Sequence, residues 1–349
     1  MQTTKHNHDA PPELEAAAAL IHGAGRIIAL CHVDPDGDAI GSLLGLGLAL
    51  RALGKHVTLA GDDVVPWNLA FLPTSDQVVH DLTGARADLV IALDCGDMRR
   101  AGRVGEQAAA LGVPLINMDH HVTNTRFGQV NVVDTDAVST TEIVHNLLSV
   151  LGVTPDADVA TCLLTGLVTD TRGFRTANVK QRVLLRAVAL MDAGASLPRI
   201  TELALDRRSF PALEMMGKAL QRVRCEDGVI WSYMTREETA PAKVGGLDDT
   251  YDADARPRYF SSTLNTVEGP SVSVFFTEDP DGTIDISMRA KPGFELSALF
   301  GEGRPLHGRG GGHPLAAGAE IKAPLAEVVD EVVGLLKALV KEQRAASKV

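Results

Sequence analysis

Short apolar runs alternate with helical patterns through the first half of the chain. The apolar runs are typical of buried strands, whereas the helical stretches repeat their apolar residues at intervals of three and four. The predicted strands are RIIALC (26–31), HVTLAG (56–61), LVIALD (89–94) and PLINMD (114–119), and the predicted helices cover 39–53, 140–152, 159–170 and 179–191. Strands that alternate with helices predict an α/β fold with a parallel sheet.

The predicted helix 39–53 is apolar on nearly all sides and contains Gly45 and Gly47. Glycine weakens a helix interior by about 1 kcal/mol relative to alanine, so its presence there needs a reason. We expect both glycines to allow close packing of this helix against the sheet.

The pattern changes after residue 193. Residues 194–221 are polar and marked by prolines, with a helical pattern after Pro211, and we expect them to connect two domains. Beyond them, 229–235, 271–279 and 283–290 have alternating or β-branched residues that predict strands, the last two joined by a hairpin at 280–282. Residues 301–318 predict a glycine-rich loop, and 324–341 predict an amphipathic helix. The expected domains are therefore 1–193 and a smaller α/β domain, 222–349, with a mixed sheet.

Composition narrows the class of protein. A chain of 349 residues with 45% hydrophobic and 22% charged residues is typical of a globular protein of two domains. We expect a cytoplasmic protein without membrane contact, because no apolar stretch approaches the roughly 20 residues of a membrane span and the four cysteines form no close pair. The net charge of -12 argues against binding of long nucleic acids but leaves short anionic substrates open.

The segment HVDPDGD (32–38) places one imidazole and three carboxylates directly after the first predicted strand. So much negative charge in one place is unfavourable unless a cation is bound. The alternative is an aspartate-rich turn that caps the following helix. This segment alone leaves both interpretations open.

Similar residues follow the other predicted elements. Asp94 ends one strand and Asp119, His120 and His121 end another, while Asp170 ends a helix. Any one of them could be a turn or capping residue. Because the carboxyl ends of parallel strands meet at one edge of a sheet, we expect these side chains to form one site. Carboxylate and imidazole ligands without thiolate suit manganese, and magnesium or zinc less well.

These motifs resemble, in order, those of the DHH phosphoesterase family: HVDPDGDAIGS, DCGD, DHH and TDTRGF. GRGGGHPLAAG resembles the glycine-rich signature of the DHH-associated domain that follows in one branch. The match extends from Ile27 to Ile321, and it is strongest with the branch of oligoribonucleases (nanoRNases) and pAp phosphatases. Several short motifs in a fixed order are far more specific than a lone glycine loop.

The resemblance implies a catalytic centre with two Mn²⁺ ions, or Mg²⁺ or another divalent metal in their place. His32 and Asp36 would hold one ion and Asp38 the other, with Asp94 between the two. His120 and Asp170 would complete the ligands of the second ion, and Asp34 falls on a variable position. Asp119 would orient the histidine pair, and His121 would contact the scissile phosphate.

The resemblance also implies substrate-binding residues in the second domain. Glycines let backbone N–H groups approach an anion closely, and an arginine fork matches phosphate oxygens. The expected residues are Arg289, Arg309, Gly310, Gly311, Gly312 and His313. A glycine run by itself is equally typical of a hairpin loop. We expect the substrate to bind in the cleft between the domains, and a homodimer.

The leading hypothesis is hydrolysis of short RNA or DNA oligonucleotides to 5′-mononucleotides, with dephosphorylation of pAp as a second activity. The alternatives within the enzyme class are a cyclic or linear dinucleotide phosphodiesterase, a longer single-strand exonuclease and a pyrophosphatase, the last disfavoured by GGGH. A nucleotide-binding regulatory protein without catalysis is the alternative outside that class.

Overall fold

A computed structural model describes residues 11–208, 210–239 and 260–346 of the chain. It divides into two compact units, Met1–Arg207 and Arg208–Val349, so the division falls inside the segment expected as a connector. Most of that segment is helical: α7 (Leu197–Ile200) and a π-helical turn, η4 (Thr201–Asp206), end the first unit, and α8 (Phe210–Gln221) begins the second. The segment 194–221, predicted as a connector with a helical pattern after Pro211, therefore belongs partly to each unit.

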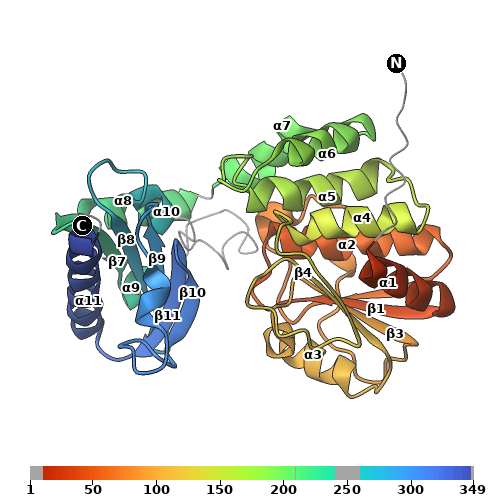
Figure 1. The fold of residues 1–349 in the computed structure, drawn as a ribbon, viewed down its shortest axis with the longest axis horizontal. Helices are drawn as coiled ribbons and strands as arrows, with labels where there is room; N and C mark the ends of the chain where they lie inside the picture. Colours follow the sequence, from red (N-terminus) through yellow and green to blue (C-terminus); the bar gives the residue numbers. More distant parts are fainter. Residues whose placement is uncertain (1–10, 209, 240–259, 347–349) are drawn as a thin grey trace. The chain divides into compact units, whose positions relative to one another are not determined.

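The first unit is built on a five-stranded parallel sheet, which confirms the predicted fold class (Figure 1). The strand order is β2-β1-β3-β4-β5. The strands are β1 (Arg26–Cys31), β2 (His56–Ala60), β3 (Leu89–Leu93), β4 (Leu115–Asp119) and β5 (Val130–Val133). Each neighbouring pair is parallel, so all carboxyl ends lie at one edge.

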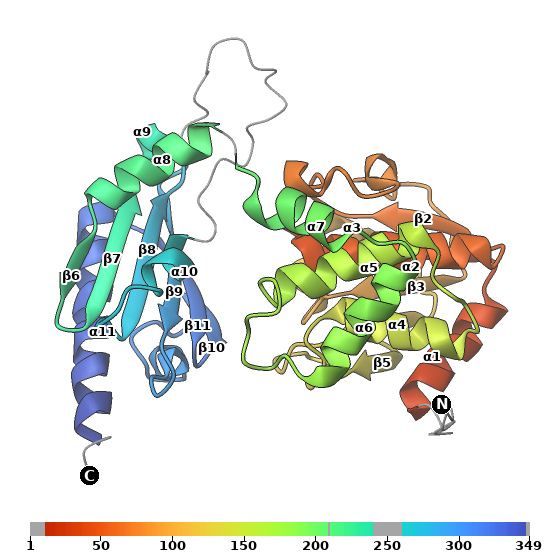
Figure 2. The same cartoon turned by 90° about the horizontal axis from the view of Figure 1, so that it is seen from above.

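Both faces of this sheet are buried, which explains the unbroken apolar runs of its strands. In β1, Ile27 and Ala29 pack with the helices of one face, while Ile28 and Leu30 pack on the other. α1, α2 and α4 cover the first face and α3 the second, while α5 packs outside α2, and α6 lies outside α5 (Figures 1 and 2). The helices are α1 (Pro12–Gly23), α2 (Gly37–Ala52), α3 (Gly102–Ala109), α4 (Thr140–Val150), α5 (Ala157–Asp170) and α6 (Gln181–Asp192), with short turns η1 (Trp67–Leu69), η2 (Ser75–Gln77) and η3 (Met98–Ala101).

The glycines of α2 do permit close packing, but not all of it is against the sheet. A Cβ on Gly47 would lie 2.3 Å from Leu59 of β2, as expected. A Cβ on Gly45 would instead lie 2.9 Å from Leu163 of α5. α2 is therefore packed between strand and helix, and the expectation for Gly45 was wrong because a second helix layer crosses that face.

The second unit contains a six-stranded mixed sheet of order β10-β11-β9-β8-β7-β6, as predicted. Only β7 and β8 are parallel. The strands are β6 (Arg224–Glu226), β7 (Val229–Met234), β8 (Val272–Glu278), β9 (Thr283–Ala290), β10 (Gly310–His313) and β11 (Ala316–Lys322). The remaining elements are α9 (Arg236–Thr239), α10 (Phe260–Leu264), η6 (Leu296–Leu299) and α11 (Leu325–Ala346). α11 packs on one face of the sheet, and α8 with α10 on the other.

The expectation that 301–318 is a loop was wrong at its end, where GGGH is an edge strand. Gly310 to His313 pair antiparallel with Ala319 to Ala316 of β11. A Cβ on Gly310 would lie 2.1 Å from the carbonyl oxygen of Gly318, and one on Gly312 would lie 2.4 Å from that of Ala316. The glycines are thus explained by close approach of two backbones, which a composition argument could not distinguish from a loop.

In the described part of the chain, no helix is both long enough and apolar enough to cross a membrane.

Candidate metal centre

The carboxyl edge of the parallel sheet gathers the polar residues expected from the sequence. His32 directly follows β1, Asp94 follows β3, and His120 follows β4, whose last residue is Asp119. Asp170 is the last residue of α5, and Asp38 lies in the first turn of α2. Elements far apart in the sequence therefore deliver these side chains to one place.

Asp36 fits both interpretations of the aspartate-rich segment 32–38, a helix cap and a cation ligand. Its Oδ1 accepts hydrogen bonds from the backbone N–H groups of Asp38 (3.0 Å) and Ala39 (3.1 Å), so it is the N-cap of α2. Its carboxylate also lies with His32 and Asp94 in a group whose ligand atoms are within 4.8 Å of one another. A capping residue can therefore still offer an oxygen to a cation.

Asp38 is completely buried and is held by the N-terminus of α4. Its Oδ2 accepts from the backbone N–H of Thr140 at 2.6 Å, and its Oδ1 accepts from that of Thr141 at 3.0 Å. The first N–H groups of a helix lack helical partners and carry partial positive charge, so they stabilise a carboxylate. This contact fixes the orientation of Asp38 inside the site.

Asp94 lies at the centre of the site in a constrained conformation. Its φ of 60° is in the left-handed region, which aspartate and asparagine tolerate better than most residues. Its Oδ1 accepts from the Thr140 hydroxyl at 2.9 Å, and its Oδ2 lies 3.4 Å from His32 Nε2.

The described residues contain three overlapping groups that could hold a metal ion. They are His32 with Asp36 and Asp94, Asp38 with His120 and Asp170, and Asp94 with His120 and His121. His120 Nε2 lies 3.3 Å from Asp170 Oδ2, 3.6 Å from Asp94 Oδ1 and 3.9 Å from Asp38 Oδ2. All the residues expected as ligands thus meet, with Asp94 between the first two groups.

The electrostatics of the site fit divalent cations. Burial, together with the carboxylates of Asp94 and Asp36, raises the pKa of Asp38 well above its ordinary value. Burial and the carboxylate of Asp38 likewise raise the pKa of Asp170. In the described part of the chain, no lysine or arginine forms an ion pair with these carboxylates. Oxygen and imidazole donors with uncompensated negative charge are what Mn²⁺ or Mg²⁺ prefers.

The pKa values of Asp94 and of the histidines near it are shifted in a different way from those of Asp38 and Asp170. Burial alone would raise the pKa of Asp94, but its hydrogen bond to His32 prevails and lowers this pKa. Burial lowers the pKa of His120, which favours the neutral imidazole that a metal ligand requires.

His121 is held by the carboxylate of Asp119 and not by that of Asp94. Its Nδ1 lies 2.8 Å from Asp119 Oδ1, whereas the same atom is 3.6 Å from Asp94 Oδ1. Asp119 is buried and also accepts from the Asn124 amide at 2.6 Å. Burial opposes the charged form, but the bond to Asp119 and the charge of Asp94 prevail and raise the pKa of His121 to about 9.

The residues expected to bind substrate in the second unit lie on two strands, β9 and β10, and on the bend that precedes β10. Arg309 is ion-paired with Glu331 of α11 at 2.9 Å, so binding a phosphate would require it to leave or share that partner. Arg289 of β9 donates to the backbone oxygen of Met288 at 2.7 Å. Gly310 to Gly312 are exposed and His313 is half-buried.

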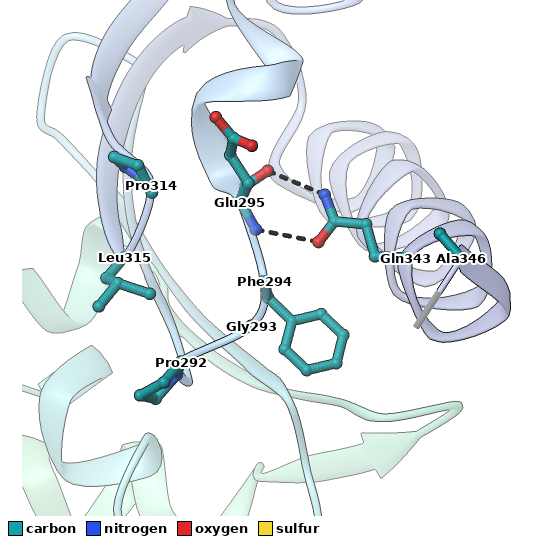
Figure 3. A pocket seen from close by; sticks show the side chains of 8 residues that line it. All are labelled: Pro292, Gly293, Phe294, Glu295, Pro314, Leu315, Gln343 and Ala346. Carbon is teal, nitrogen blue, oxygen red and sulfur yellow. Dashed lines mark hydrogen bonds between the residues drawn. The ribbon is translucent and has the colours of Figure 1, made fainter. Parts of the chain in front are cut away.

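An open pocket of the second unit lies beside this segment without including it (Figure 3). Its wall contains Pro314 and Leu315, which directly follow His313, and the side chain of Gln343. The Gln343 amide exchanges two hydrogen bonds with the backbone of Glu295, at 2.9 and 3.2 Å, and so ties α11 to the loop before η6. None of the residues expected to bind substrate lines this pocket.

The arginines that follow Asp94 differ in their contacts. Arg99 is paired with Asp97 at 2.9 Å and Arg103 approaches Asp62 at 3.7 Å, as solvated surface residues do. Arg100 Nη2 instead lies 3.5 Å from His32 Nδ1. Phe174, which lies in the TDTRGF motif, packs against the core of the first unit.

Thr140 is the site residue that sequence reasoning missed. It is completely buried, and it contacts Asp38 through its backbone and Asp94 through its hydroxyl. The available signal was the sequence STTE at 139–142, in which Ser139 caps α4 and Glu142 accepts from the N–H of Val138. That signal predicts a helix start, but not the carboxylates that the start would contact.

We expect Thr140→Val to weaken Mn²⁺ binding about 10–100-fold, because loss of the hydroxyl frees Asp94 to turn away. Titration calorimetry of the full chain measures this. Thr161→Val is the matched control, since the Thr161 hydroxyl donates within α5 to Ala157. Equal affinities of the Thr140 variant and wild type would contradict the positioning role.

Comparison with known proteins agrees with this architecture. Residues 26–167 match the N-terminal domain of the DHH family, and residues 240–342 match the DHHA1 domain. The bifunctional oligoribonuclease and PAP phosphatase NrnA of Thermus thermophilus is 36% identical over 304 residues, which cover 85% of each chain. The protein of the same name from Bacillus subtilis is 27% identical over 315 residues, 89% of this chain and 93% of its own.

A solved structure shows the same fold. The exopolyphosphatase-related protein of Bacteroides fragilis superposes with a TM-score of 0.81 at 24% identity, over 94% of this chain and 97% of its own. The chain therefore belongs to the DHH family of phosphoesterases, in the branch that pairs a DHH domain with a DHHA1 domain. It is a hydrolase of phosphoester bonds, similar over most of its length to the NrnA proteins.

Proposed function

We propose that the protein hydrolyses short oligonucleotides to 5′-mononucleotides and removes the 3′-phosphate of pAp, with two Mn²⁺ ions as cofactors. The observation that carries the proposal is a pair of neighbouring ligand groups, with Asp94 Oδ1 of the first 3.6 Å from His120 Nε2 of the second. The names of the relatives from Thermus thermophilus and Bacillus subtilis, both oligoribonucleases and PAP phosphatases, support the substrate class.

The two groups divide the ligands between the ions. His32, Asp36 and Asp94 would hold one, and Asp38, His120 and Asp170 the other, with Asp94 adjoining both. A bound pair of divalent ions supplies an activated water and neutralises charge on the attacking and leaving oxygens of a phosphoester. This chemistry requires no protein nucleophile.

The chain's own residues position the substrate and hold a proton. Asp119 accepts from Nδ1 of His121, which fixes the ring and leaves Nε2 free for a phosphate oxygen. The bond to Asp119 raises the pKa of His121, which favours the protonated ring, so Nε2–H can donate to the phosphate as negative charge builds up there. His121 also lies in a ligand group with Asp94 and His120, but its atom nearest to Asp94 is the one bound to Asp119.

The second unit would supply the remaining contacts to the substrate through Arg289, Arg309, Gly310, Gly311, Gly312 and His313. The exposed residues Gly310 to Gly312 of the GGGH edge strand and the imidazole of His313 suit an anionic ligand. A binding site between the two domains stays a prediction, as do the homodimer and the cytoplasmic location.

A panel of substrates tests the proposal. Purified full-length protein with Mn²⁺ is given a labelled five-nucleotide RNA, a long single strand, pAp, cyclic di-AMP and pyrophosphate. We expect release of mononucleotide from the short RNA and of phosphate from pAp, with little action on the other compounds. Cleavage of cyclic di-AMP or pyrophosphate alone would contradict the substrate class, and sustained activity on the long strand would indicate an exonuclease.

A further inference from the structure

One arginine at the rim of the metal centre differs from its neighbours in its partners. Arg100 lies in η3, which follows β3 at the carboxyl edge of the parallel sheet. It is exposed, and within 11–208, 210–239 and 260–346 no carboxylate forms an ion pair with it. Arg99 and Arg103, by contrast, each approach an aspartate, at 2.9 and 3.7 Å. Arg100 is therefore a cation beside an acidic site that is not neutralised by a surface carboxylate.

The backbone holds Arg100 beside the first ligand group. Its carbonyl oxygen accepts from the N–H of Val33 at 2.6 Å, and its own N–H donates to the carbonyl oxygen of Asp97 at 3.0 Å. These bonds place Arg100 Nη2 3.5 Å from His32 Nδ1. The other ring nitrogen of His32, Nε2, faces Asp94 at 3.4 Å. The guanidinium thus lies one imidazole ring away from the atoms that would hold an ion.

The contact with His32 leaves the donors of the guanidinium unused. His32 Nδ1 lies 2.7 Å from the carbonyl oxygen of Val33, which can only accept, so Nδ1 carries the proton. A histidine that binds a metal through one nitrogen donates its other N–H to such an acceptor. Two donors therefore face each other between Arg100 and His32, and a guanidinium has no acceptor to offer. The N–H groups of Arg100 are available to an anion.

The charge of the centre explains why a further cation is needed. Four carboxylates belong to the first two ligand groups, those of Asp36, Asp38, Asp94 and Asp170. Together they match the charge of two divalent ions, so the loaded centre has no surplus positive charge for a second phosphate. The charge of a protonated His121 is matched by Asp119, whose Oδ1 lies 2.8 Å away. An arginine fork outside the ligand groups suits a second phosphate.

We propose that Arg100 binds the phosphate of the substrate that is not cleaved, which is the 5′-phosphate of pAp or the neighbouring phosphodiester of an oligonucleotide. This inference rests on the proposed function. The guanidinium lies beyond the His32 ring, which separates it from a phosphate bound at the ligand groups, and its exposure leaves it open to the next phosphate. A substrate with one phosphate lacks this contact, so Arg100 selects for molecules with two or more.

Arg172 is the competing candidate beside the second ligand group. It is exposed and follows Asp170 by two residues. Burial raises the pKa of Asp170, and the charge of Arg172 opposes this rise, so the arginine lies near that carboxylate. A second phosphate bound by Arg172 and not by Arg100 is therefore the competing outcome of the test.

Two nucleotides that differ only in the second phosphate test the assignment. pAp has phosphates at both positions, whereas adenosine 3′-phosphate lacks the one at the 5′ position. We expect Arg100→Met to lower kcat/KM for pAp about 10–100-fold more than kcat/KM for adenosine 3′-phosphate, as the loss of a hydrogen bond between charged groups does. Arg100→Lys should recover part of this loss, because lysine keeps the charge but not the fork. Arg99→Met, the matched control, should leave both values as in the wild type.

Binding measurements separate this role from a structural one. Titration calorimetry with Mn²⁺ should give the same affinity for Arg100→Met as for the wild type, because His32 keeps its bond to Val33. With Ca²⁺ in place of Mn²⁺ to suppress turnover, calorimetry also gives the affinities for both nucleotides, and Arg100→Met should weaken the binding of pAp selectively. This readout holds even if the wild type hydrolyses neither nucleotide, a result that would contradict the proposed function and not this inference.

Three results would overturn the assignment of Arg100. The first is an equal loss of affinity for both nucleotides in Arg100→Met, and the second is a loss of Mn²⁺ affinity in that variant, which would make Arg100 a positioning residue for His32. The third is a loss of selectivity for pAp in Arg172→Met and not in Arg100→Met.

Discussion

Asp94→Asn should abolish hydrolysis of a five-nucleotide RNA, lowering kcat on the order of 10³-fold or more. One proposed ligand group loses its carboxylate, and the other loses a negative charge that lies 3.6 Å from its His120 Nε2. Asparagine is chosen over alanine because the residue has a φ of 60°, which asparagine adopts with less strain. The amide can still accept from the Thr140 hydroxyl, so the local structure is retained. Loss of activity would then report the missing carboxylate and not a collapsed loop. Release of labelled mononucleotide in the presence of Mn²⁺ is the measurement.

Asp88→Asn is the matched control for this change. Asp88 precedes β3 and accepts from the N–H groups of Gly25 and Arg26, at the opposite edge of the same sheet. We expect its variant to retain activity with a small change in thermal stability. If Asp94→Asn cleaves the RNA as fast as Asp88→Asn, Asp94 is not part of the catalytic centre.

His121→Ala should lower kcat by about 10²–10⁴-fold while leaving metal binding nearly unchanged. The reason is that the Nδ1 atom, which lies 3.6 Å from Asp94, is bound to Asp119 at 2.8 Å, so this atom is not available to a cation held by Asp94. Asp119→Asn should have a smaller effect of about 10–100-fold, because it alters only the orientation and charge of the ring. Steady-state kinetics on the short RNA, together with Mn²⁺ titration, separates the two roles.

His56→Ala provides the comparison for His121. His56 is exposed at the start of β2, at the amino end of the parallel sheet. Its loss should affect neither kcat nor metal affinity. A His121 variant that loses Mn²⁺ affinity in proportion to its activity would make His121 a ligand, in the group with Asp94 and His120.

The sheet of the first unit was predictable because its strands are buried on both faces. Unbroken apolar runs such as RIIALC have few interpretations other than a buried strand. Because parallel strands end at one edge of a sheet, Asp94 and His120 are expected to lie together. β5 was missed because its four residues, Val130–Val133, alternate apolar and polar side chains too briefly to be distinguished from a loop. α1 was missed because its alanine-rich sequence follows a polar, proline-containing segment.

The contacts that orient the ligands could not be read from the sequence. Asp38 and Thr140 are 102 residues apart, and no local pattern relates them. The glycines of the GGGH segment could not be explained from the sequence either. They are required because the backbone of β11 lies directly against them, and this contact is visible only in the structure. The residue types at the strand ends therefore indicated which side chains could form the site. The contacts that these side chains and the glycines make with α4 and β11 could be found only from the packing of those elements.

The number of Mn²⁺ ions bound per chain tests the two-metal centre most directly. Elemental analysis after equilibrium dialysis, supported by titration calorimetry, should find two ions in the wild type. It should find one in Asp170→Asn, because the group of Asp38, His120 and Asp170 is lost while that of His32, Asp36 and Asp94 remains. A wild type that binds a single ion, or an Asp170 variant that still binds two, would contradict the account.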